Sequence, residues 1–137
     1  MTELDGSLIN DGVERYRSLN QKHIEAVEQG AEDKLQYLEI KTRKSGIHVA
    51  AAARVDALKG KDHDSAYEQL KETGKAITIV SSNVKKGESF DMVKSVAIYR
   101  SDDDVDDAMN EAKTKASSLP DFQTLLDKSA DAWENTF

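Results

Sequence analysis

The densest group of side chains that could bind a metal ion lies in the segment "SDDDVDDAMNEAK", residues 101–113, where five aspartates fall within seven positions. The calcium loop of an EF-hand needs oxygen ligands at positions 1, 3 and 5, a glycine at position 6 and a glutamate at position 12. Counted from Asp102, position 6 is Asp107 and position 12 is Lys113. Asp107 replaces the glycine that the turn needs, and Lys113 replaces the glutamate that completes the calcium ligands. We therefore expect no metal ion here.

The same aspartates suit the start of a helix. Ser101 is a favourable N-cap, Asp104 stands three residues later in the position of a capping-box partner, and negative charge in a first helical turn is favoured by the helix dipole. The sequence therefore predicts a helix that starts at Ser101. A recognition surface for a basic partner, formed by Asp102, Asp103 and Asp106, is the second interpretation.

A second candidate for metal chemistry is the His63-Asp64 doublet in "KDHDS", residues 61–65. Such a doublet occurs in helical metal-dependent phosphohydrolases, which also need an earlier histidine, here His23 or His48, and a later aspartate such as Asp103. So loose a pattern arises easily in an acidic chain, and we favour a loop that caps the next helix. We predict a protein that is not an enzyme, with no catalytic residue, no metal and no cofactor.

The charge of the chain is unevenly distributed. The net charge is −7, and residues 101–137 carry three basic and ten acidic side chains, whereas residues 1–100 are balanced. This distribution argues against affinity for nucleic-acid phosphates. An acidic mimic of nucleic acid is the third functional alternative, weakened by the neutral first 100 residues.

Apolar residues spaced by three or four positions predict helices over most of the chain. The predicted segments are residues 9–30, 31–60 with a weak point at Ser45-Gly46, 67–84, 105–119 and 118–137. With 33% charged and 6% aromatic residues, this pattern favours an all-α single-domain bundle of five or six helices over residues 1–137. The alternative is an α+β fold with a small strand pair within residues 76–100, where "AITIV" and "SVAIYR" are rich in β-branched residues.

The segment "HVAAAARVDALKG", residues 48–60, has small side chains that would let another helix approach closely. We interpret this 48–60 helix as part of the core, with a homodimer interface as the alternative.

The C-terminal end carries two large aromatic residues, Trp133 and Phe137. Aromatic anchors beside charged groups are typical of binding hot spots. The sequence therefore predicts a non-catalytic protein–protein interaction module of the adaptor, dedicated chaperone or inhibitor/immunity type. Its partner would be a protein with a basic surface, guided by Asp102, Asp103 and Asp106 and anchored by the two aromatic residues.

The start of the chain, "MTELDGSLIN", has neither the basic residues nor the apolar run of a signal peptide, and no stretch reaches the ~20 apolar residues of a membrane span. We therefore expect a cytoplasmic protein that does not bind membranes, with export by a signal-less route left open.

Overall fold

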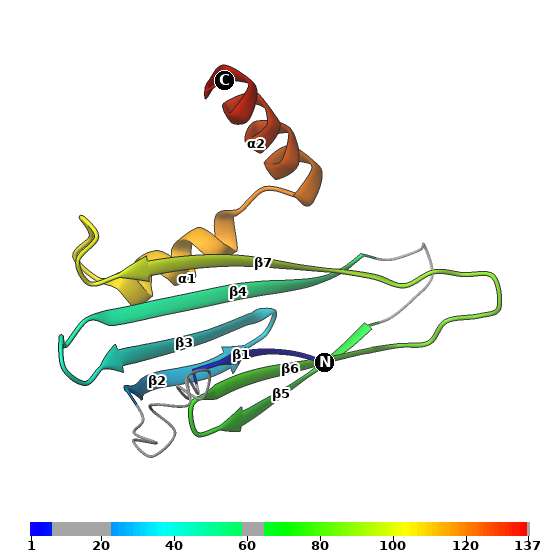
Figure 1. Cartoon of the computed structure of the whole chain (residues 1–137). Helices are drawn as coiled ribbons and strands as arrows, with labels where there is room; N and C mark the ends of the chain where they lie inside the picture. The colour runs from blue at the N-terminus through cyan, green and yellow to red at the C-terminus, as the bar shows by residue number, and fades with distance from the viewer. Residues whose placement is uncertain (7–22, 59–64, 137) are drawn as a thin grey trace, which may run out of the picture.

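A computed structural model describes residues 1–6, 23–58 and 65–136, and it consists mainly of β-strands (Figure 1). The described strands are β1 (Thr2–Asp5), β2 (Ile24–Glu32), β3 (Leu35–Thr42), β4 (His48–Leu58), β5 (Ser65–Glu72), β6 (Lys75–Ser82) and β7 (Asp91–Arg100). Two helices follow them, α1 (Ala108–Ser118) and α2 (Phe122–Thr136). The predicted all-α bundle of five or six helices is therefore wrong.

The predicted alternative, a strand pair within residues 76–100, is also wrong, because β6 and β7 belong to different sheets. One sheet has the strand order β1-β6-β5 and the other has the order β2-β3-β4-β7, and all neighbouring strands are antiparallel. That residues 1–137 form one domain stays a prediction, although the domain is not helical.

Tight turns explain two of the hairpins. Residues Asp33 and Lys34 connect β2 to β3, and Thr73 and Gly74 connect β5 to β6. Asp33 has a φ of 51° and Gly74 a φ of 80°, and positive φ values are typical of the two-residue turns that match the twist of a hairpin. Both segments predicted as helices contain hairpins. Within residues 31–60, β3 pairs with β4, and within residues 67–84, β5 pairs with β6. Residues 59 and 60 lie outside the described residues.

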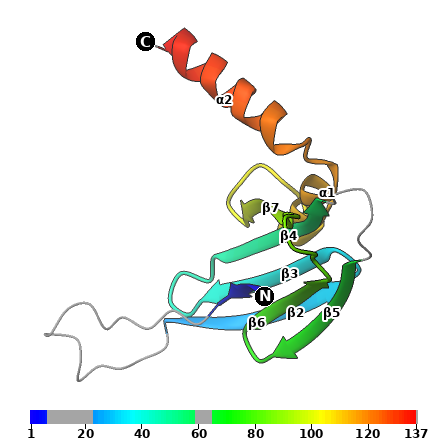
Figure 2. The same ribbon diagram turned by 90° about the vertical axis from the view of Figure 1, so that its right-hand side faces the viewer.

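The four-stranded sheet is the middle of three layers. Helix α1 covers one face, where Met109, Ala112 and Ala116 pack with Ala50 and Ala52 of β4 and with Ala97 of β7. The three-stranded sheet covers part of the other face, lying over β2 and β3 and away from β7 (Figures 1 and 2).

Strand β4 shows why the helix prediction failed. Ala50 and Ala52 face α1, while Ala53 and Val55 point to the opposite side of the sheet, and all four are 0% exposed. A strand that is buried on both faces has no alternation of apolar and polar residues. The predicted 48–60 helix is therefore wrong, and a homodimer through that helix loses its structural basis.

A polar pair lies buried within the β-structure. Gln36 of β3 and Thr78 of β6 are both 0% exposed, and the Thr78 hydroxyl donates to Gln36 Oε1 at 3.4 Å. Gln36 Nε2 is buried and finds no hydrogen-bond partner in the described part of the chain. A buried donor without a partner costs about 1–3 kcal/mol of stability.

We expect the double substitution Gln36→Leu/Thr78→Val to raise the free energy of unfolding by about 1 kcal/mol, because it removes the unpaired amide together with its partner. Urea denaturation measures the change. The single substitution Gln36→Leu is the control: it leaves the Thr78 hydroxyl without its acceptor, so its gain should be smaller. A double variant less stable than the unmodified protein would contradict the assignment.

Candidate functional site

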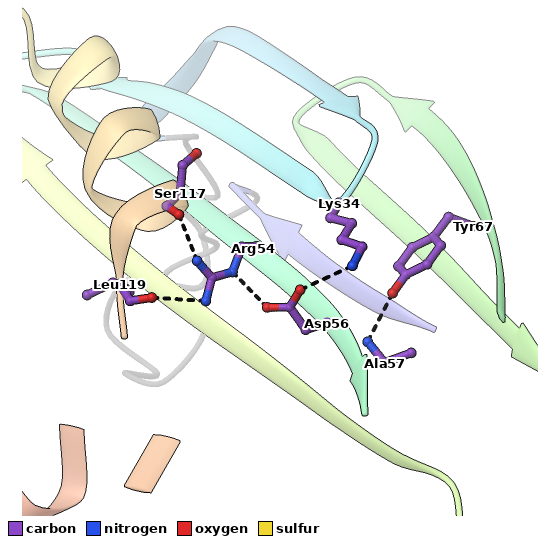
Figure 3. Close-up of polar contacts among 7 residues, drawn as sticks. All are labelled: Lys34, Arg54, Asp56, Ala57, Tyr67, Ser117 and Leu119. Carbon is purple, nitrogen blue, oxygen red and sulfur yellow. Dashed lines mark hydrogen bonds and ion pairs between the residues drawn. The ribbon is translucent and has the colours of Figure 1, made fainter. Parts of the chain in front are cut away.

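The side chain of Arg54 joins the middle sheet to the end of α1 (Figure 3). Its Nε donates to Asp56 Oδ2 at 2.7 Å, its Nη1 to the Ser117 carbonyl at 2.7 Å and its Nη2 to the Leu119 carbonyl at 3.0 Å. The side chain is 23% exposed. One guanidinium group therefore links β4 to two backbone carbonyls more than 60 residues away in the sequence.

This arrangement follows from strand geometry and from the needs of a helix end. Arg54 is two residues after Ala52, so it points to the face of β4 that packs against α1. The last carbonyls of a helix lack partners within the helix and carry partial negative charge, which a cation stabilises. Arg54 therefore fixes the backbone at the point where the chain leaves α1.

Further contacts connect this region to the second sheet. The Tyr67 hydroxyl of β5 accepts a hydrogen bond from the Ala57 amide of β4 at 2.9 Å. Lys34 Nζ lies 3.5 Å from Asp56 Oδ1 and 5.7 Å from the centre of the Tyr67 ring (Figure 3). Because the Lys34 side chain is 54% exposed, its ion pair contributes at most about 1 kcal/mol.

Two hollows meet at Arg54. The larger has a volume of about 840 Å³ and is lined by Glu32, Asp33, Lys34, Leu35, Arg54, Tyr67, Gln69 and Ser117. The smaller has a volume of about 510 Å³ and is lined by Arg54, Asp56, Ala57, Val93, Ser95, Asp121, Phe122 and Gln123. The larger hollow thus lies beside the β2–β3 turn and β5, and the smaller one lies beside the start of α2.

Asp121 organises the first turn of α2. Its carboxylate accepts hydrogen bonds from the Thr124 amide at 3.0 Å and from the Thr124 hydroxyl at 2.9 Å. Both bonds stabilise the charged carboxylate and lower the pKa of Asp121. The bond from the backbone amide makes the larger contribution. The helix therefore starts at a defined residue directly after the junction that Arg54 holds.

Helix α2 has no buried residue, and it extends away from the sheets (Figure 1). Phe122 is 61% exposed, Leu126 is 48% exposed and Trp133 is 63% exposed. These residues are four and seven positions apart, so they lie on one side of the helix, which we call the apolar stripe. Exposed apolar side chains on one side of a helix make this side of α2 the candidate surface for contact with a partner.

The structure separates the residues that the sequence analysis grouped as a partner-binding surface. Asp102, Asp103 and Asp106 lie in the β7–α1 connection, at the end of α1 remote from α2 (Figure 1). Asp102 and Asp103 lie 3.3 Å and 3.7 Å from Arg100 Nε. Trp133 lies on α2, and Phe137 is outside the described residues. Partner binding by these residues stays a prediction, but the aspartates and Trp133 do not form one surface.

The N-cap of α1 is Asp107, whose carboxylate accepts a hydrogen bond from the Asn110 amide at 3.0 Å. The Ser101 hydroxyl instead accepts from the His48 amide at 3.1 Å and so joins β7 to the start of β4. The prediction that Ser101 caps this helix is therefore wrong, and the true cap lies six residues later.

We expect Asp107→Ala to lower the free energy of unfolding by about 0.5–2 kcal/mol, because the Asn110 amide loses its side-chain acceptor. Asp106→Ala removes the same charge from the neighbouring position and should have a clearly smaller effect. Thermal unfolding compares the two variants. Equal losses would mean that charge near the helix start, and not the cap, is responsible.

No group of three or more His, Cys, Asp or Glu side chains that could hold a metal ion occurs among residues 1–6, 23–58 and 65–136. The His63-Asp64 doublet lies outside these residues. His48 Nδ1 lies 2.5 Å from Glu39 Oε1, on the neighbouring strand. Among the residues that the structure describes, no helix is long and apolar enough to cross a membrane.

The residues around the two hollows, Arg54, Asp56 and Tyr67, were not among the site residues predicted from the sequence. The spacing Arg54-Val55-Asp56 places charged residues two positions apart around an apolar one, which is the period of a strand. That signal was obscured by the preceding alanines, which favour a helix when they are considered alone.

Comparison with known protein families identifies the family of the chain. A family model described as "Glycosyl hydrolase family 65, N-terminal domain" matches residues 1–136. No curated protein matches the chain, and no solved structure does. The match contradicts the interpretation of the chain as an adaptor, dedicated chaperone or inhibitor/immunity protein. The metal-dependent phosphohydrolase and the nucleic-acid mimic are likewise wrong.

Proposed function

The chain belongs to the family of N-terminal domains of glycosyl hydrolase family 65, and from this membership we propose that it is a non-catalytic β-domain that packs against the catalytic part of a glycosyl hydrolase. In this function, α2 is the contact element. The apolar stripe is buried against the catalytic part, and the Arg54 junction sets the direction of α2.

The observation that carries this proposal is the exposure of the apolar stripe on a helix that has no buried residue. Burial of one large apolar side chain contributes about 1.5–3 kcal/mol. Phe122, Leu126 and Trp133 together could therefore stabilise an interface between two domains of ordinary size. An amphipathic helix that leaves these side chains in water gains none of this free energy.

The chemistry of glycoside hydrolysis supports a non-catalytic role. The reaction requires two carboxyl groups on either side of the glycosidic bond, and the general acid is kept protonated by apolar surroundings. Glu32 and Asp33, the carboxylates of the larger hollow, are both exposed at the β2–β3 turn. Asp56, beside the smaller hollow, is paired with Arg54. These surroundings suit ion pairs and hydrogen bonds better than proton donation to a leaving group.

We test the proposal with Trp133→Ala in the glycosyl hydrolase that contains this domain, by measuring hydrogen exchange of residues 122–136. A buried hot-spot residue contributes about 2 kcal/mol or more, so exchange should become about 30-fold faster. Asp131→Ala is the matched control, because Asp131 lies on the side of α2 opposite Trp133. Its exchange should stay close to that of the unmodified enzyme.

Two outcomes would contradict the proposal. In the first, α2 exchanges equally fast in the unmodified enzyme and in the Trp133→Ala variant, which would mean that the apolar stripe is not covered. In the second, the 137-residue chain forms a dimer that Trp133→Ala dissociates, as measured by light scattering. The stripe would then bind a second copy of the chain and not a catalytic part.

A further inference from the structure

The larger hollow beside Arg54 has walls that hydrogen bonds hold in place. The Tyr67 hydroxyl is bound by the Ala57 amide at 2.9 Å, and Gln69 Nε2 donates to the Asp33 carbonyl at 2.7 Å. Arg54 is fixed by its three bonds (Figure 3). The volume of about 840 Å³ is within the range of small-molecule sites. Because these side chains are already held in place, little binding free energy would be spent on ordering them when a ligand binds.

The lining combines a flat apolar group with acceptors for hydroxyl groups. Tyr67 supplies an aromatic ring, and its hydroxyl is already engaged. The carboxylates of Glu32 and Asp33 are exposed and form no ion pair with other described residues. Carboxylates accept short, strong hydrogen bonds from hydroxyl donors. A pyranose ring has the matching chemistry, with apolar C–H faces and hydroxyl groups around its rim.

The charges in and beside the hollow favour a neutral ligand over an anionic one. Lys34 and Arg54 are the cations of the lining, and both already contact Asp56, at 3.5 Å and 2.7 Å. Glu32 and Asp33 add two further negative charges. With Asp56 included, the carboxylates outnumber the cations, so a phosphate group would meet repulsion.

We infer that this hollow is a binding site for a neutral saccharide, which packs one face of a sugar ring on Tyr67 and donates hydroxyl hydrogen bonds to Glu32 and Asp33. The inference rests on the proposed function for its ligand class, since the family is one of glycosyl hydrolases. The site lies on this domain and is independent of the apolar stripe. It would hold a part of the substrate remote from the bond that is cleaved.

The test is a titration of the ¹⁵N-labelled chain with maltose and, separately, with cellobiose, followed by amide chemical shifts. The two disaccharides differ only in the configuration of the linkage, so together they report whether the site distinguishes α from β linkages. We expect saturable shifts for residues 32–35 and 67–69 with at least one of them. A third titration with inorganic phosphate should give no saturable shift at these residues.

Three variants show which groups bind the sugar. Tyr67→Ala should weaken binding about tenfold or more, whereas Tyr67→Phe keeps the ring and should bind nearly as well as the unmodified chain. Asp33→Asn should weaken binding severalfold without disturbing the turn, because asparagine tolerates positive φ. Ile98→Ala is the control, since it removes an exposed apolar side chain on β7 outside the hollow and should leave sugar binding unchanged.

The inference is overturned if neither disaccharide gives saturable shifts up to about 50 mM, well above the millimolar dissociation constant of a weak complex. It is also overturned if phosphate binds in place of the sugars, or if Tyr67→Ala, with an unchanged fold in its amide spectrum, binds as well as Tyr67→Phe. Failure of the saccharide site would leave hydrogen exchange of α2 unaffected. The proposed function and this inference can therefore fail separately.

Discussion

Arg54→Ala is expected to lower the free energy of unfolding by about 2–4 kcal/mol, one of the two largest losses expected from a single substitution in this chain. The substitution removes three hydrogen bonds and leaves Asp56 and the carbonyls of Ser117 and Leu119 without that donor. Removing one member of a partly buried ion pair lowers the free energy of unfolding by more than the pair contributes, because the remaining member stays away from water without its partner. Urea denaturation followed by circular dichroism measures the loss.

Arg100→Ala is the matched control for Arg54→Ala. The Arg100 side chain is 56% exposed and pairs with Asp102 and Asp103 at the surface, so its loss should cost less than about 1 kcal/mol. Arg54→Lys keeps the positive charge but lacks the planar guanidinium group with its several donors. Its free energy of unfolding should therefore lie between those of Arg54→Ala and the unmodified chain. If the Arg54 and Arg100 variants were equally stable, the Arg54 junction would not hold α1 to the sheet.

Ala112→Leu is expected to lower the free energy of unfolding by about 3 kcal/mol. Ala112 is 0% exposed, and it packs with Ala50 and Ala52 between α1 and the sheet. Three additional carbon atoms at such a position must push the helix away from the strand or force side chains out of their preferred rotamers. Thermal and urea denaturation of the purified chain measure the effect.

Ala132→Leu introduces the same side chain in the exposed helix α2. Because leucine and alanine are both good helix formers, this control should change stability by no more than about 0.5 kcal/mol. A loss at Ala132 as large as the loss at Ala112 would point to an effect of leucine itself. It would contradict close packing between α1 and β4.

The two helices and the buried side of α1 follow from the apolar spacing in the sequence alone. The predicted helices over residues 105–119 and 118–137 contain α1 and α2. Met109, Ala112 and Ala116, which are spaced by three or four positions, are the buried residues of α1. These predictions are confirmed. They succeeded because α1 is covered on only one side and α2 is exposed, so their apolar residues keep the period of a helix.

The rest of the fold depends on contacts between segments that are distant in the sequence. In β4 the run of small residues from Ala50 to Ala53 is buried on both faces, between α1 and the other side of the sheet. Local propensity favours a helix for such a run, but the strand prevails because β4 pairs with β3 on one edge and with β7 on the other and is buried on both faces. For the same reason, the segment predicted as a helix over residues 67–84 contains the β5–β6 hairpin.

The candidate site depended still more on tertiary structure. Arg54 of β4 donates hydrogen bonds to the Ser117 and Leu119 carbonyls at the end of α1. The Tyr67 hydroxyl of β5 accepts a hydrogen bond from the Ala57 amide of β4. A single sequence carries the type and spacing of these residues but not the contacts between them. Spacing along a helix or strand reports which residues share a face, whereas the partner of that face is chosen by burial and hydrogen bonding between segments that are distant in the chain.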